Sequence, residues 1–364
     1  MTIKEVAQLA GVSAAAVSRY LNGGPLSQEK KERIAWAIEE TGYRPNLMAK
    51  TMRTGKVRQV GIIVPRIFSE SVNQVMDGIA EELLEKGYLT VLGYSDPRKD
   101  RELQYLDMMQ SNRVAGIILM ATTLSDYKKS ALAASSVPLV ITGQCIDDLP
   151  CVYHDDFNAV RELTELLLKK GRQKIAYIGV YEEDKAAGLA RRQGMQQALR
   201  DAGLDADNAP RKIADFSAQS GYACMMELLD EHPDLDGVVC ATDIIAHGAM
   251  SALKARGRRI PADVSLAGVG DNWSDLVSSP TLTTVHLHQR RCGSEAAQLL
   301  LKMIGEETES ADESKETNVS AVSGAQDTPA AQMDPSAAEA QNTSVKRTAP
   351  QVKLGYQIIE RESV

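Results

Sequence analysis

The sequence lacks several features that would place it in a common class of protein. It has five cysteines but no C-x-x-C pair, and its first residues, "MTIKEVAQLAG", lack the long apolar core of a signal peptide. No apolar run approaches the roughly 18 residues that span a membrane. These absences predict a cytoplasmic protein with reduced thiols and no membrane partner.

The signatures of common enzymes are missing too. There is no P-loop, no G-x-G-x-x-G and no nucleophile elbow. The "YHDD" at residues 153–156 and the "HLH" at residues 286–288 lack the companion ligands of a recognisable metal motif, so we interpret their histidines as structural. The sequence therefore predicts a protein that is not an enzyme and needs no cofactor.

The charge is distributed unevenly along the 364 residues. Residues 1–58 carry ten Lys/Arg and five Asp/Glu, a net charge of +5. Since the whole chain carries −8, the remainder carries −13. A small basic head on an acidic body is typical of a nucleic-acid-binding module joined to a domain with another role.

The basic head is predicted to be all helical. Thr2 and Glu5 form a capping box for a first helix, which Gly11 ends. Ser13 caps a second helix over residues 14–21, and Ser27 caps a third, which ends at Gly42. Apolar residues at helical spacing give each helix a buried stripe: Ile3, Val6, Ala7, Ala10, Val17, Leu21, Ile34, Ala37 and Ile38.

Two short helices joined through "AGVS" predict a helix-turn-helix, whose second helix enters the major groove of DNA. The small side chains of Ala14 to Ala16 allow close approach to base edges, and Arg19 can reach a guanine or a phosphate. The alternative is that the alanines only favour helix and that Arg19 is a solvated charge. The turn, the capped helices and the local basicity favour DNA binding.

The stretch "TIKEVAQLAGVSAAAVSRYLNG", followed by "SQEKKERIAWAIEETGYRPNLMAKTMRTGK", resembles the head of the LacI/GalR family of bacterial transcription regulators. The resemblance implies operator DNA as a partner and a homodimer as the binding species. Two family positions that help to select the operator fall on Ala14 and Ala15 here. Because alanine cannot form side-chain hydrogen bonds to bases, we expect Arg19 and the hinge to contribute more to operator selection. The DNA-binding residues implied are Thr2, Ser13, Ala14, Ala15, Ser18, Arg19, Asn22, Asn46, Ala49 and Met52.

The family's hinge corresponds to "RPNLMAKTMRTG". Residues 47–53 are too few for a stable isolated helix. By resemblance they fold when two subunits pair over the minor groove, with Met52 as an apolar wedge in the central base step. The alternative, a flexible basic linker over residues 45–58, is compatible with this when DNA is absent.

From Val60 onward, short apolar runs alternate with helical stretches, which predicts parallel sheets covered by helices. The runs are "VGIIV", "LTVLGY", "GIILM", "LVITG", "KIAYIG", "GVVCA", "SLAGVG" and "TTVHL". They are too many for one compact sheet, so we expect two α/β lobes with a cleft between them. The resembled family has this periplasmic-binding-protein-like body, with crossings expected here near Asp156, near Leu287 and before the last strand.

Ligands bind beyond the carboxyl ends of parallel strands, so the polar residues after each run are candidates. Arg191 begins an R-x-x-G that matches an effector-contacting arginine of the family, and Asp243 and Asp271 match positions near the effector. For each candidate the alternative is a loop cap or surface charge, and for Arg66 an ion pair between the lobes. The candidate effector residues are Arg66, Ser69, Gln144, Arg191, Asp243, Asp271 and Trp273, with Glu70, Asn272 and Tyr153 beside them.

Segments starting at Cys151 and Gly268 look like the sucrose-operon branch of the family, and "IIVPRIFSES" is similar to the trehalose-responsive branch. The resemblance implies a repressor of a carbohydrate-use operon that a sugar or sugar phosphate releases, sucrose 6-phosphate first. Two other hypotheses stay open. One is a broad catabolite regulator with a phosphoprotein corepressor, and the other is a sugar-binding transport protein.

Four domain segments follow. We expect a head over residues 1–44, a hinge over 45–58, a body over 59–304 and 351–364, and an insertion over 305–350. The insertion is poor in large apolar residues, which predicts disorder. We interpret it as a neutral loop between the last helix of one lobe and the final strand of the other, with a partner-binding segment as the alternative.

Overall fold

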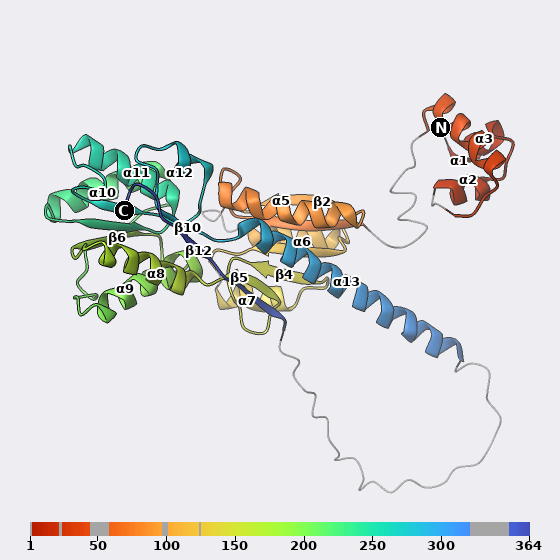
Figure 1. Cartoon of the computed structure of the whole chain (residues 1–364). Coiled ribbons are helices and arrows are strands. Elements are labelled where there is room, and N and C mark those ends of the chain that lie inside the picture. Colours follow the sequence, from red (N-terminus) through yellow and green to blue (C-terminus); the bar gives the residue numbers. More distant parts are fainter. Residues whose placement is uncertain (1, 22–23, 44–57, 97–100, 124, 321–348) are drawn as a thin grey trace, which may run out of the picture. The chain divides into compact units, whose positions relative to one another are not determined.

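The computed structural model describes residues 2–21, 24–43, 58–96, 101–123, 125–320 and 349–364. It divides into two compact units, Met1–Arg58 and Gln59–Val364, which we call the head and the body (Figure 1). The expected class, a helical head joined to a two-lobed body of parallel sheets, is confirmed.

The head consists of three helices around a small apolar core. The capping box of Thr2 and Glu5 is formed, and Ser13 Oγ accepts from the backbone N–H of Ala16 at 3.2 Å. Ser27 precedes the third helix as expected but makes no capping bond with its side chain. The helices are α1 (Ile3–Leu9), α2 (Ala14–Leu21) and α3 (Gln28–Thr41).

The first lobe of the body contains a six-stranded sheet, in the order β11-β5-β4-β3-β1-β2, with every neighbouring pair parallel. Apolar residues of α5 and α13 pack on one face, and those of α6 and α7 pack on the other. Its elements are β1 (Gln59–Val64), α5 (Glu70–Glu85), β2 (Leu89–Tyr94), α6 (Glu102–Ser111), β3 (Gly116–Met120), α7 (Asp126–Ala133), β4 (Leu139–Thr142), β5 (Cys151–His154), α13 (Gln289–Ser320) and β11 (Gln351–Leu354).

The second lobe contains a parallel sheet in the order β7-β6-β8-β9, and α8 to α11 contribute to its core. A π-helix, η1, leads directly into α9, so the chain is helical throughout residues 185–201. The elements are α8 (Asp156–Lys169), β6 (Ile175–Gly179), η1 (Lys185–Ala190), α9 (Arg191–Asp201), β7 (Arg211–Ile213), α10 (Ala218–Glu231), β8 (Gly237–Cys240), α11 (Asp243–Ala255), β9 (Ser265–Ala267) and α12 (Trp273–Val277).

The chain passes between the lobes where the sequence predicts. It leaves the first lobe between β5 and α8, returns after β10 (Thr284–His286) to α13, and leaves again after β11. The last strand, β12 (Gln357–Ile359), pairs antiparallel with β10. These three segments join the two lobes into the body in Figure 1.

The expected place of the insertion differs in one respect. It lies between α13 and β11, which both belong to the first lobe, because β11 pairs in register with β5 from Gln351 opposite Cys151. The crossing between lobes follows after Leu354. Helix α13 extends to Ser320, into the part for which the sequence predicts disorder, and residues 321–348 lie outside the described residues.

Candidate functional site

The exposed face of α2 is the candidate DNA-reading surface. Ala15 and Arg19 are both exposed and lie four residues apart, so they share one side of the helix. Val17 is fully buried on the opposite side, against the core that α1 and α3 provide. Ser13 is exposed at the start of the helix, and Ala14 and Ser18 are half-buried.

Two glycines set the geometry of this surface. Gly11 adopts a φ of 61° in the turn between α1 and α2, a left-handed conformation that favours glycine. A Cβ on Gly24 would lie 2.5 Å from Cγ of Arg19, so the bare backbone there makes room for the arginine stem. Four residues implied by the resemblance, Asn22, Asn46, Ala49 and Met52, lie outside the described residues.

The candidate effector site is a cavity between the two lobes. About 850 Å³ of space outside the protein atoms lies within it, a volume that includes its open mouth. The predicted residues Arg66, Ser69 and Arg191 line it. The first lobe also contributes Thr122, Thr142 and His154, and the second contributes Asp184, Phe216 and Thr242.

Arg66 contacts two aromatic side chains of the second lobe. Its Nη2 donates to the hydroxyl of Tyr181 at 3.0 Å, and its guanidinium carbon lies 3.5 Å from the ring centroid of Phe216. Burial lowers the pKa of Arg66, which the nearby Tyr181 opposes. Among the described residues no carboxylate forms an ion pair with it. The alternative of an interlobe ion pair is therefore not what the structure holds.

Asp184 is a cavity residue that sequence reasoning missed. Its Oδ1 caps η1 by accepting from the backbone N–H groups of Ala186 and Ala187, and it also accepts from Nε2 of Gln144 at 3.4 Å. Burial raises the pKa of this carboxyl from its ordinary 3.8 to about 6, although the Ala187 hydrogen bond opposes the shift. The only sequence signal was its position shortly after an apolar run.

Arg191 lies in a buried ion pair. Its Nε is 2.7 Å from Oδ1 of Asp156, and the two residues are 8% and 5% exposed. Its Nη1 also donates to the carbonyl of Ala241. Asp156 begins α8, directly after the first crossing between lobes, so this pair fixes α9 against the crossing.

Three polar atoms of lining residues lack a partner in the part of the chain that the structure describes. They are Oγ1 of Thr122, Nε2 of His154 and Oγ1 of Thr242. Burial lowers the pKa of His154 to about 4, so its ring is neutral at neutral pH. Buried polar groups normally find a hydrogen bond, so these atoms suit a polar ligand held between the lobes.

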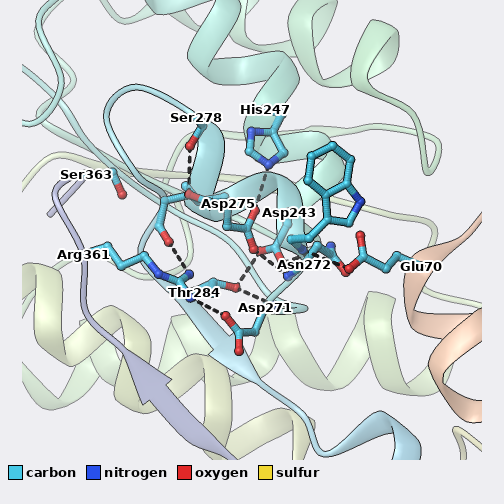
Figure 2. A network of polar contacts seen from close by, with 12 residues as sticks. Glu70, Asp243, His247, Asp271, Asn272, Asp275, Ser278, Thr284, Arg361 and Ser363 are labelled. Atoms are coloured by element: carbon cyan, nitrogen blue, oxygen red, sulfur yellow. Dashed lines mark hydrogen bonds and ion pairs between the residues drawn. The ribbon is translucent and has the colours of Figure 1, made fainter.

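Asp243 and Asp271 belong to a network of polar contacts, which Figure 2 shows from close by. Asp243 is fully buried, accepts from Thr284 Oγ1 at 2.6 Å, and has its pKa raised well above the ordinary value by burial and by Asp275. Asp271 pairs with Arg361 at 2.5 Å and with His286 at 2.9 Å. Neither lines the cavity, although the adjacent Thr242 and Gly270 do.

The aromatic residues proposed from the sequence do not line the cavity. Trp273 is 67% exposed, and its backbone N–H donates to Oε1 of Glu70 at 2.9 Å, a contact between the lobes. Tyr153 is also absent from the lining, where Phe216 supplies the aromatic ring. Gln144 is buried and does not line the cavity, but it donates to the carbonyl of Thr122 and to Oδ1 of Asp184, two residues that do.

Comparisons with known proteins agree with this geometry. Residues 2–46 match the family of bacterial regulatory proteins of the lacI type, and residues 164–324 match a periplasmic binding protein-like domain. The chain is 32% identical over 305 residues to the sucrose operon repressor of Staphylococcus xylosus, which covers 83% of this chain and 93% of that one. The chain belongs to the LacI family of bacterial regulatory proteins. It is a transcription regulator with a helix-turn-helix head.

Other LacI-family members are similar over comparable lengths. The regulator RegA of Clostridium saccharobutylicum is 32% identical over 306 residues, covering 83% of this chain and 92% of its own. The structure of a CelR–cellobiose complex superposes with a TM-score of 0.69 at 27% identity, over 100% of both chains. A lac repressor dimer bound to operator gives 0.80 at 21% identity, over 100% and 98%, which shows the same fold.

The described residues show neither a membrane-spanning helix nor a metal-binding cluster. None of their helices combines the length and apolarity that a membrane crossing requires. No group of three or more His, Cys, Asp or Glu side chains within the described ranges is placed to hold a metal ion. The "HLH" histidines contact each other edge to face, and His286 pairs with Asp271 instead.

Proposed function

We propose that the chain is a cytoplasmic, homodimeric repressor of a carbohydrate-use operon, which a sugar or sugar phosphate releases from its operator. The proposal that the effector is a sugar rests on the polar atoms of the cavity that have no hydrogen-bond partner among the described residues. Hydroxyl groups of a sugar can both donate and accept, so they suit Thr122, His154 and Thr242 together. Phe216 supplies a ring for the apolar side of a sugar.

A disaccharide or its 6-phosphate fits this site best, with sucrose 6-phosphate as the first candidate. Two of the relatives support this class: one is named as a sucrose operon repressor, and the CelR structure is a cellobiose complex. Arg66 supports the phosphate, because a guanidinium can grip a phosphate with two parallel, charge-assisted hydrogen bonds. Within the described residues, the guanidinium donates one hydrogen bond, to the uncharged hydroxyl of Tyr181.

Calorimetry with sucrose, sucrose 6-phosphate and trehalose 6-phosphate tests the proposal. We expect the sucrose phosphate to bind more tightly than sucrose, and Arg66→Ala to reduce that preference by roughly 10- to 100-fold. Tyr181→Phe is the matched control, because it removes the same contact between the lobes and keeps the guanidinium. Equal affinities for sucrose and sucrose 6-phosphate would exclude recognition of the phosphate. If none of the sugars bound, the proposal that the effector is a sugar would be wrong.

The DNA part rests on α2 and on the hinge implied by the resemblance. We propose Arg19 as the main base-reading residue and Met52 as the wedge that unstacks the central base step. Met52→Ala should reduce DNA bending in a gel-shift phasing assay and leave sugar binding unchanged, because a wedge needs apolar bulk. Unchanged bending would exclude this role for Met52.

Exposed apolar side chains on α12 support a dimer. Trp273, Leu276 and Val277 are 67%, 61% and 70% exposed, and a cluster of large apolar side chains on a surface is typical of protein–protein contact. Sedimentation of Leu276→Glu tests this: a shift from dimer to monomer supports the interface, and an unchanged dimer excludes α12 from it.

A further inference from the structure

The loop between β4 and β5 brings two cysteines together. Cys145 is exposed near the start of this loop, and Cys151, at the first position of β5, is fully buried. The backbone nitrogen of Ile146, which is bonded to Cys145, lies 3.2 Å from Sγ of Cys151, and Cys145 adds to the effect of burial in raising the pKa of that thiol. The other three cysteines are buried in other elements.

The backbone of the loop folds around the Cys151 thiol. Its Sγ accepts from the backbone N–H of Ile146 at 3.2 Å, and the same thiol lies 3.0 Å from the carbonyl of Leu149. The N–H of Leu149 donates to the carbonyl of Ile146 at 3.3 Å and closes the turn. These bonds hold the Cys151 thiol against the residue that follows Cys145, so the two cysteines are neighbours in the folded loop.

Cys145 is open to small reagents. It lines a surface pocket together with Lys129, Asp148 and Lys185, on the outside of the loop. Burial raises the pKa of the Cys151 thiol to about 11, so it stays protonated and is shielded from reagents in water. The exposed thiol is therefore the one that meets an oxidant first.

We propose that Cys145 and Cys151 are a redox-active pair that a peroxide converts to a disulfide. The Cys145 thiolate attacks one peroxide oxygen, the O–O bond breaks, and Cys145 becomes a sulfenic acid as hydroxide leaves. The Cys151 sulfur then attacks the sulfenic sulfur, the S–O bond breaks, and the departing hydroxide takes the Cys151 proton as water. The two thiols supply both electrons that reduce the peroxide.

The position of this pair gives the crosslink a structural consequence. Gln144 directly precedes Cys145, and its amide reaches Asp184 in the second lobe. On the other side of the loop, β5 leads to His154 and Asp156, which line the cavity. A disulfide therefore restrains a segment that touches both lobes.

Thiol counting on the full chain tests the proposal. We expect a limited dose of hydrogen peroxide to lower the free thiols of the subsequently denatured protein from five to three. Trypsin releases both cysteines on one peptide, residues 130–161, which should lose two hydrogen atoms and regain them after treatment with a dithiol. Five remaining thiols would overturn the proposal, as would a sulfinic acid at Cys145 beside a free Cys151.

Two variants distinguish oxidation of the Cys145–Cys151 pair from oxidation of the other cysteines. Cys145→Ser should keep all four of its thiols under the same dose, because the buried Cys151 has lost its partner. Cys224→Ser is the matched control and should fall from four to two, because its pair is intact. Loss of thiols from Cys145→Ser at the rate of the control would also overturn the proposal.

Discussion

In the described part of the head, every buried residue is apolar: Val6, Ala7, Ala10, Val17, Ile34 and Ala37. The body instead buries charged and polar groups, among them Asp156, Asp184, Arg191, Asp243 and Asp275. The head keeps its hydrogen-bonding groups on its surface, where a large partner such as DNA reaches them. The body encloses such groups, where only a small ligand can meet them.

The different buried groups of the head and the body predict that mutations affect the stability of the two units differently. An apolar core of three helices loses little when a surface residue changes, because exposed side chains contribute little to stability. A buried charge depends on its oppositely charged partner, and much of its desolvation cost is uncompensated once that partner is removed. Mutations at the body's binding residues should therefore change stability, whereas mutations on the reading face of the head should change binding alone.

The largest effect is expected for Asp156→Ala, which leaves Arg191 buried without its carboxylate. We expect the body to lose roughly 3–5 kcal/mol of unfolding free energy. The measurement is urea unfolding followed by fluorescence, because each unit has one tryptophan, Trp36 in the head and Trp273 in the body. Trp36→Phe reports the body alone, and Trp273→Phe reports the head alone.

A matched change on the surface provides the control. Asp234 pairs with Lys174, but both side chains are more than half exposed, so Asp234→Ala should leave the unfolding of the body unchanged. If both variants lose the same stability, burial does not decide the effect. A loss that also appears in the head would contradict the independence of the two units.

The sequence predicts the head and the strands better than it predicts the cavity. Apolar runs bounded by turn residues identify central strands such as β1, β3 and β8, since these are buried on both faces. The edge strand β7, with the sequence "RKI", has no such run and was missed. β5 is short and has polar ends, so its run was also missed.

The cavity shows why side-chain direction escapes a sequence argument. The expectation that polar residues after a strand face the ligand is met by Arg66, which lines the cavity. The same expectation applied to Asp243 and Asp271, but neither lines the cavity, because they bond to Thr284 and Arg361. Asp184 follows β6 by five residues and enters the cavity because its carboxylate caps η1. Which way these carboxylates turn depends on hydrogen bonds to residues far along the chain, such as Thr284 and Arg361.

A smaller effect on the body should come from pH. The folded pKa of Asp184, about 6, lies above its ordinary 3.8, so the folded chain binds more protons between these values. Stability due to this group is therefore greatest below about pH 4, falls as pH rises through 6, and is constant above. Asp184→Asn should remove that fall, which amounts to at most about 3 kcal/mol.

The measurement is the urea midpoint of the body from pH 4 to pH 7, in the Trp36→Phe background. Asparagine keeps the oxygen that caps η1, so the variant differs from wild type mainly in its inability to ionise. Parallel curves for the two proteins would mean that Asp184 titrates at its ordinary pKa, and that the lobes open enough to hydrate it.

The smallest expected energy belongs to the head. Arg19→Ala should weaken operator binding by roughly 1–3 kcal/mol and weaken random DNA less, because a base contact discriminates and a phosphate contact does not. Unfolding of the head should stay unchanged, since the arginine is exposed on α2. The control is Lys30→Ala on α3, which removes one exposed positive charge outside the recognition helix. Equal losses on operator and random DNA for Arg19→Ala would reduce its role to a phosphate contact, and the reading of the operator would then rest on the hinge.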